Sequence, residues 1–222
     1  MFAEALRGRL IRRVTRGRHL EGTLGVAAAG HRAYIGGRWD ELGRIQFDFM
    51  VGRGLEPHHV FLDIACGSLR GGVHFIRYLD PGNYLGIEKE KALIRSGLSK
   101  ELPRQVYREK RPELVVSDSF EFDRFSKQPD FSLAQSLFTH LITSDVELCL
   151  ANLRSNVGPQ HELYATFANG SSEQNPPQSH ALKCFYFTPD ELTAIGARNG
   201  WLCEYLGDWG HGKSVMMKFA AQ

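Results

Sequence analysis

The sequence lacks the features that mark membrane-spanning, secreted or metal-binding proteins. Its longest apolar runs are far too short to cross a bilayer, and no apolar leader with a cleavage site is apparent. The cysteines form no CxxC pair and do not have the spacing of metal ligands. They are Cys66, Cys149, Cys184 and Cys203. We therefore expect reduced thiols, no bound metal and a cytoplasmic protein.

Two signatures of nucleotide phosphate binding are also missing. No P-loop lysine follows a glycine-rich turn. A dinucleotide fingerprint needs glycine at its second position, where the backbone approaches the pyrophosphate, and counted from Gly67 that position is Leu69. A nicotinamide-dependent oxidoreductase is therefore disfavoured, and titration with the dinucleotide would detect it directly.

The chain does have a strand–turn–helix segment at 60–72. An apolar run contains an acid, Asp63, and is followed by small residues and a new apolar-periodic segment. This layout places a ligand at the carboxyl edge of a parallel sheet. Arg70 and a helix amino terminus lie in the same turn, so a ligand with both an amine and a carboxylate suits these groups.

A second short strand at 83–88 ends in another acid, Glu88. A carboxylate at that place can accept hydrogen bonds from both hydroxyls of a ribose. The two segments together predict a site that holds a nucleoside.

Segments 62–67 and 86–88 together resemble the first two motifs of class I S-adenosylmethionine-dependent methyltransferases. Segment 131–141 resembles the fourth strand of that family and the residues after it, and the likeness runs from Trp39 to the carboxyl end. Ala65 and Leu69 stand where the family usually has glycine. The resemblance implies an α/β fold with a doubly wound, Rossmann-like, seven-stranded sheet. This sheet is mostly parallel with an antiparallel last strand, in a three-layer sandwich.

The remaining pattern fits a single α/β domain. Helices are expected at 40–53, 73–79, 89–98, 144–153 and 189–198, and further strands at 113–117, 162–168, 201–206 and 214–219. Capping boxes at 144–147 and 188–191 predict where two of these helices begin.

The resemblance also implies a cofactor, S-adenosylmethionine, and its contacts. Asp63 and Gly67 are expected at the methionine end, Glu88 at the ribose, and Asp118 at the adenine amino group, with the next two residues against the ring. Gln135 is expected near the sulfur and the acceptor. The full expected set is Asp63, Ala65, Gly67, Arg70, Glu88, Asp118, Ser119, Phe120, Gln135 and Ser136.

Three histidines are candidate general bases for an acceptor hydroxyl or phenol. His140 follows the fourth strand, His180 lies in a polar loop after the fifth, and His211 lies between the last two strands. A structural role for His140 and a plain surface position for the other two are the competing interpretations.

The first residues differ in kind from the rest. Residues 1–20 hold six arginines and one acid, a formal charge of +5 in a chain whose total is +2. Apolar residues recur at steps of three and four, so one helical face is apolar and the opposite face largely arginine. We divide the chain into a basic amphipathic extension and possible lid at 1–38 and a methyltransferase domain at 39–222. The extension suits peripheral contact with an anionic membrane; a solvated leader is the alternative, and no nucleic acid is expected.

The sequence thus predicts a methyltransferase acting on a small or lipid-like acceptor, at oxygen. A saccharide or glycoside methyltransferase and a non-catalytic nucleoside-binding interaction protein remain as alternatives.

Overall fold

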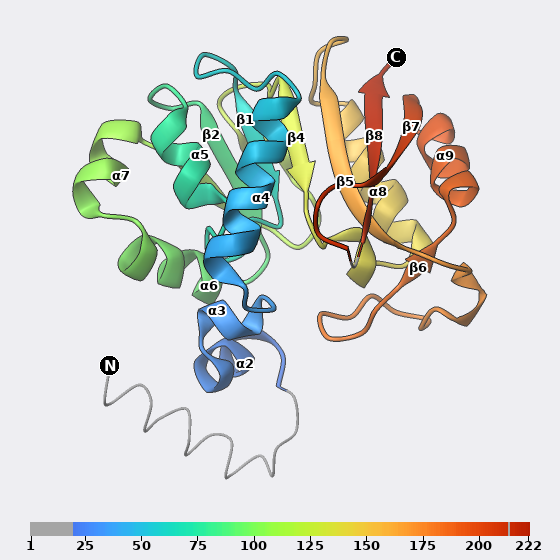
Figure 1. Cartoon of the computed structure of the whole chain (residues 1–222), viewed down its shortest axis with the longest axis horizontal. Helices are drawn as coiled ribbons and strands as arrows, with labels where there is room; N and C mark the ends of the chain where they lie inside the picture. Colours follow the sequence, from blue (N-terminus) through green and yellow to red (C-terminus); the bar gives the residue numbers. More distant parts are fainter. Residues whose placement is uncertain (1–19, 213) are drawn as a thin grey trace.

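A computed structural model describes residues 20–212 and 214–222 (Figure 1). Its centre is a sheet with the strand order β3-β2-β1-β4-β5-β8-β7. Strand β8 is antiparallel to both of its neighbours, and the other neighbouring pairs along this order are parallel. The strands are β1 (Phe61–Ile64), β2 (Tyr84–Glu88), β3 (Glu113–Val116), β4 (Phe131–Ala134), β5 (Glu162–Asn169), β7 (Trp201–Asp208) and β8 (Val215–Ala221). The expected mostly parallel sheet is confirmed, and a two-residue strand, β6 (Tyr186–Phe187), adds to it beside β5.

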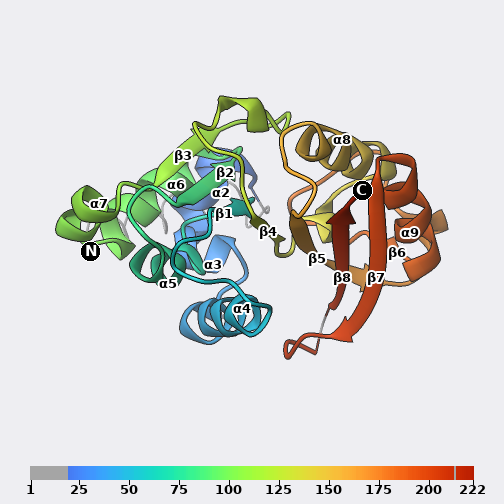
Figure 2. The same cartoon turned by 90° about the horizontal axis from the view of Figure 1, so that it is seen from above.

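Helices cover both faces of this sheet, as Figure 2 shows from above. Side chains of α4 (Trp39–Gly52) and α5 (Gly72–Tyr78) share one buried cluster with Phe61 of β1. Side chains of α8 (Thr143–Arg154) and α9 (Pro189–Arg198) share another with Leu62. Neighbouring residues of β1 enter different clusters because successive side chains of a strand point to opposite faces. The result is the expected three-layer sandwich.

The two capping boxes predicted from the sequence can be compared with the observed starts of α8 and α9. At α9 the box is confirmed: Glu191 N donates to Thr188 Oγ1 at 3.2 Å, and Thr188 N donates to Glu191 Oε2 at 2.6 Å. At α8 it is wrong, because the helix begins at Thr143 and its cap position, Ile142, has no side-chain capping bond. The Ile142 N–H donates instead to Ser179 Oγ at 2.8 Å, so a distant loop replaces the local cap.

The crossover between β2 and β3 contains more structure than the sequence indicated. Helix α6 (Lys91–Ser96) continues into a π-helical turn at Gly97–Glu101, and α7 (Arg104–Lys110) follows. The turn packs closely on the segment after β1: a Cβ on Gly97 would lie 2.6 Å from the Ser68 carbonyl oxygen. The absence of a side chain at Gly97 thus allows the π-helical turn to approach the strand–turn–helix segment closely.

Two short helices precede α4: α2 (Gly22–Ala29) and α3 (His31–Tyr34). They lie at the lower end of α4 in Figure 1, on the edge where the parallel strands end. Glu101 fixes α3 to the π-helical turn, since its carboxylate accepts hydrogen bonds from His31 at 2.6 Å and from Arg32 at 2.6 and 2.8 Å. Residues 20–38 therefore pack on the domain as a cover, a name we keep below.

The amphipathic stretch assigned to a membrane surface, 1–20, lies outside the described residues except for its last position. Among the helices that are described, none is long and apolar enough to cross a membrane.

Candidate functional site

A cavity of about 750 Å³ opens at the carboxyl ends of β1, β2 and β4. Such volumes are in the upper part of the range for small-molecule sites, roughly 300–1,000 Å³. The cover, the turn after β1, the loop after β3, the segment after β4 and a loop at 179–182 all contribute to its wall.

Most residues that the sequence assigned to a site meet at this cavity. Those that line it are Asp63, Ala65, Gly67, Arg70, Glu88, Asp118, Phe120, Gln135, Ser136, His140 and His180. Ser119 and His211 are not among the lining residues. The His211 ring lies 5.6 Å from that of Trp209, between β7 and β8.

The turn after β1 explains how the chain accommodates leucine where the family has glycine. Ala65 and Leu69 both have left-handed backbone conformations, with φ of 61° and 68°. The Leu69 side chain is fully buried and lies against Gly72 and Gly97, within the core cluster under α5. It therefore points away from the cavity and leaves the ligand edge open.

Glu88 ends β2 with its carboxylate directed to the same turn. Its Oε2 accepts the Gly67 N–H at 3.0 Å and its Oε1 accepts the Glu90 N–H at 2.8 Å. Burial raises the pKa of Glu88, and these two backbone hydrogen bonds oppose the shift. Each carboxylate oxygen keeps a lone pair for a further donor, as two ribose hydroxyls require.

Asp63 lies on the neighbouring strand, one residue before the end of β1. Its Oδ2 accepts a hydrogen bond from the Tyr84 hydroxyl at 2.8 Å, and both side chains are buried. Burial raises the pKa of Asp63 to about 7, while the Tyr84 hydrogen bond opposes the shift. A cationic amine placed here would favour the ionised form.

A cluster of polar side chains joins the turn after β1 to the segment after β4. Gln135 Oε1 accepts hydrogen bonds from Arg70 Nη2 and Gln46 Nε2, each at 2.7 Å. Gln135 Nε2 donates to Ser136 Oγ at 2.7 Å. The Ser136 N–H donates to Thr166 Oγ1 at 2.7 Å, which fixes its backbone at a φ of 57°.

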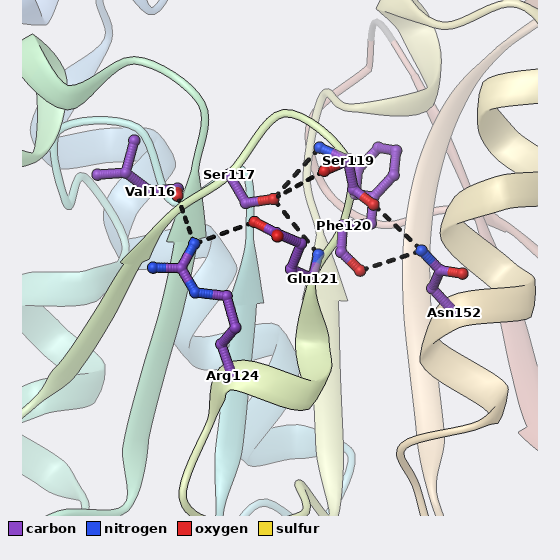
Figure 3. A network of polar contacts seen from close by, with 7 residues as sticks. All are labelled: Val116, Ser117, Ser119, Phe120, Glu121, Arg124 and Asn152. Atoms are coloured by element: carbon purple, nitrogen blue, oxygen red, sulfur yellow. Dashed lines mark hydrogen bonds and ion pairs between the residues drawn. The ribbon is translucent and has the colours of Figure 1, made fainter.

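Side chains also fix the loop that follows β3 (Figure 3). Ser117 Oγ accepts the N–H groups of Ser119 and Glu121, at 3.2 and 3.4 Å. From α8, Asn152 Nδ2 donates to the carbonyls of Ser119 and Phe120, at 3.1 and 3.2 Å. The loop is thereby held with Asp118 and Phe120 at the cavity wall.

His140 ends a 3₁₀ turn at Phe138–His140 just beyond β4. Its Nδ1 lies 2.8 Å from the Lys183 carbonyl oxygen. Because a carbonyl only accepts, Nδ1 carries the proton and Nε2 carries the lone pair in the neutral ring. Burial lowers the pKa of His140, so the neutral ring prevails at pH 7. This cavity wall therefore holds a histidine in a form that can accept a proton.

The cover and the loop at 179–182 meet across the cavity. His180 Nε2 lies 2.6 Å from Glu21 Oε1. The Leu182 N–H donates to His180 Nδ1 at 3.0 Å, so His180 Nε2 is the protonated nitrogen that donates to Glu21. Tyr34, Ile35 and Gly36 of the cover line the cavity from the same side.

Sequence reasoning missed a set of apolar and polar wall residues. Five leucines line the cavity: Leu93, Leu137, Leu141, Leu148 and Leu182. Leu148 and Leu182 are 43% and 40% exposed, so the wall includes exposed apolar side chains. Gln46 was also missed, although it is the polar residue on the buried stripe of α4 beside Leu42 and Met50, a signal the sequence carries.

Comparison of the sequence with protein-family models and with curated proteins gives no match. Comparison of the structure finds the fold of class I S-adenosylmethionine-dependent methyltransferases. The magnesium protoporphyrin IX methyltransferase of Synechocystis PCC 6803, with S-adenosylhomocysteine bound, is 13% identical at a TM-score of 0.60, over 97% of this chain and 94% of that one. The glycopeptide N-methyltransferase MtfA with S-adenosylmethionine is 14% identical at 0.62, over 81% and 94%. The CcbJ methyltransferase of Streptomyces caelestis is 13% identical at 0.64, over 84% and 92%. The chain therefore has the fold that the sequence resemblance implied.

Proposed function

We propose that the protein is an S-adenosylmethionine-dependent methyltransferase that methylates an oxygen of a small acceptor with an apolar body. The placement of Asp63, Glu88 and His140 on one cavity carries the proposal. Two acids suit the amine and ribose ends of a nucleoside-bearing amino acid, and a neutral histidine on the same cavity can take the proton of an acceptor hydroxyl. Structures of the same fold contain S-adenosylmethionine or S-adenosylhomocysteine, which supports this cofactor.

The cofactor would lie along the carboxyl ends of the strands. Asp63 holds the amine, Glu88 accepts the ribose hydroxyls, and Asp118 and Phe120 contact the adenine. The cofactor supplies an activated methyl group on a sulfonium. The chain aligns the acceptor with that methyl group and excludes water, and the cover and the loop at 179–182 provide the walls for both tasks.

The acceptor would enter beside the leucines. Exposed Leu148 and Leu182 favour an apolar body at the entrance, and His140 Nε2 takes the proton of its hydroxyl. Methyl transfer to oxygen then leaves a methyl ether and a demethylated cofactor, with the released proton on His140. A saccharide acceptor is disfavoured because a sugar offers little apolar surface to these leucines.

The test is calorimetric titration with S-adenosylmethionine and S-adenosylhomocysteine, followed by a screen of phenols, lipid-like alcohols and sugars. We expect micromolar binding at one ligand per chain and methyl transfer to phenols or apolar alcohols. Glu88→Ala should remove binding while the chain remains folded, since the variant deletes the ribose acceptors. Wild-type binding without turnover of any acceptor would favour the non-catalytic nucleoside-binding protein. Retained affinity in both Glu88→Ala and Asp63→Ala would contradict the site itself.

We further propose that residues 1–20 bind anionic lipid surfaces, on the charge pattern of their sequence alone. Deletion of residues 1–19 should leave the fold intact and weaken sedimentation with vesicles that contain phosphatidylserine. Equal vesicle binding by the truncated chain would contradict this proposal.

A further inference from the structure

Arg70 lies at the junction of three segments: the turn after β1, the segment after β4 and the cover. It is 7% exposed, and its guanidinium contacts backbone and side-chain oxygens from the other two segments. Nη1 donates to the carbonyls of Ile35 and Gly37, at 3.1 and 3.0 Å, and Nη2 donates to Gln135 Oε1 at 2.7 Å. One side chain in the turn after β1 thus connects the cover to the segment after β4.

The guanidinium has donors that the described residues do not use. Arg70 Nε is buried and has no hydrogen-bond partner among them. Within the same part of the chain no carboxylate forms an ion pair with Arg70. A buried cation bonded only to neutral oxygens is costly, and an unsatisfied buried N–H adds to the cost. Burial accordingly lowers the pKa of Arg70 to about 10. The position therefore suits an anionic ligand, and Arg70 lines the cavity.

The cover at this point lies directly over the glycine turn. The Ile35 side chain is close enough to Gly67 that a Cβ there would lie 3.4 Å from Ile35 Cγ2. Gly36 and Gly37 have φ of 90° and 66°, a conformation that presents the two carbonyls to Arg70. No other atom lies within 4 Å of a Cβ built on Gly37, so this glycine is needed for its backbone conformation and not for space.

We propose that Arg70 couples the amino-acid end of the cofactor to closure of residues 35–37. Nη2 donates one of its two hydrogens to Gln135, and the other is the donor for the cofactor carboxylate. The two Nη1 bonds hold the cover over the same group. The inference rests on the proposed function, because it takes a ligand with a carboxylate in this cavity. It adds that the cover closes in response to that carboxylate and not to the nucleoside.

The test compares two ligands in the full-length chain, S-adenosylhomocysteine and 5′-methylthioadenosine, which lacks the amino-acid end. Arg70→Lys keeps the charge but loses the fork of donors. We expect it to weaken S-adenosylhomocysteine binding by roughly 10–100-fold and to leave methylthioadenosine affinity within about twofold. In hydrogen exchange, S-adenosylhomocysteine should protect residues 31–38 of the wild-type chain, and methylthioadenosine should not. Arg70→Lys should abolish that protection.

Two further variants separate coupling from general damage. Gly37→Ala should act in the same direction as Arg70→Lys, whereas Gly54→Ala, with a φ of 93° and equally open space at the end of α4, should change neither affinity. Equal weakening of both ligands by Arg70→Lys would overturn the coupling and leave Arg70 a structural residue. A wild-type chain that binds neither ligand would instead overturn the proposed function, and the coupling with it.

Discussion

The Tyr84 hydroxyl oxygen lies 2.8 Å from Asp63 Oδ2, and this hydrogen bond connects the neighbouring parallel strands β1 and β2. Gly72 makes this contact possible, because a Cβ there would lie 2.6 Å from the Tyr84 hydroxyl oxygen. The contact keeps one oxygen of Asp63 occupied while burial raises its pKa to about 7. Ionisation of this buried acid destabilises the fold, and a cationic amine beside it would offset that cost.

Asp63→Asn should therefore stabilise the chain at alkaline pH and remove cofactor binding. An acid whose pKa is raised on folding stabilises the fold while protonated, and that contribution is lost as the pH rises through about 7. Asparagine keeps an acceptor for Tyr84 and has no charge to bury. We expect a midpoint several degrees above wild type at pH 8, since roughly 1 kcal/mol shifts a chain of this size by about 2–4 °C. The difference should shrink at pH 5.

Thermal unfolding at both pH values measures this effect, and exposed Asp123→Asn is the matched control. An Asp63→Asn variant that is less stable than wild type at pH 8 would contradict the raised pKa.

His161 should contribute to stability in the opposite sense. It is buried at the start of β5, where Nδ1 donates to the Pro129 carbonyl at 2.8 Å and the ring meets Trp201 edge-on at 5.9 Å. Burial lowers its pKa to about 4. The unfolded chain therefore takes up a proton before the folded chain does, and stability is lost as the pH falls from about 6.5 to 4.

His161→Asn keeps a donor for Pro129 and removes the titrating ring. Relative to wild type, its stability should decline less as the pH falls across this window, whereas that of Asp63→Asn should decline more. In the double variant the two effects offset each other, so the slope of stability against pH should differ less from that of the wild type than in either single variant. Chemical denaturation at several pH values measures these slopes. Parallel curves for wild type and His161→Asn would contradict the assignment.

Much of this arrangement could be predicted from the sequence, where the signal is local. Glu88 ends an apolar run and Asp63 lies near the end of another, and strand topology alone brings such residues to one edge. The capping box of α9 depends on residues three apart. Helix α7 gave no signal because it has no buried residue and hence no amphipathic pattern.

The contacts that complete the site are non-local, and the sequence did not indicate them. Arg70 reaches Ile35 from 35 positions away, and Gln46 reaches Gln135 from 89. The false capping box at α8 also reflects a non-local contact, since the helix begins one residue earlier than Ser144 and Ser179 in a distant loop accepts the N–H of its cap residue, Ile142. Local pattern therefore located two acids of the cavity, and tertiary packing selected the partners of the other residues.

Glu21→Ala should speed release of S-adenosylhomocysteine without abolishing binding. The hydrogen bond from His180 Nε2 to Glu21 Oε1 connects the cover to the loop at 179–182 across the cavity, and both side chains are partly exposed. Exposed contacts of this kind contribute about 0–1 kcal/mol, so the dissociation rate should rise at most about fivefold. Stopped-flow release measures it. Glu56→Ala removes a comparable exposed pair, with His58 at 3.4 Å, before β1 and should have no effect. Equal rates for both variants would show that the pair does not restrain the cover.

His140→Asn should separate catalysis from loop anchoring. Asparagine can still donate to the Lys183 carbonyl, but it has no basic nitrogen to take the acceptor proton. We expect kcat for a phenol to fall by about 10²–10⁴ while cofactor affinity is unchanged. Burial lowers the pKa of His140. In a plot of kcat against pH, the wild-type rate should therefore fall on the acid side only below the usual range of histidine pKa values, and the variant should not show this fall. Phenols acidic enough to be ionised at neutral pH should recover most of the rate in the variant. Uniform loss across phenols of all acidities would assign His140 a structural role.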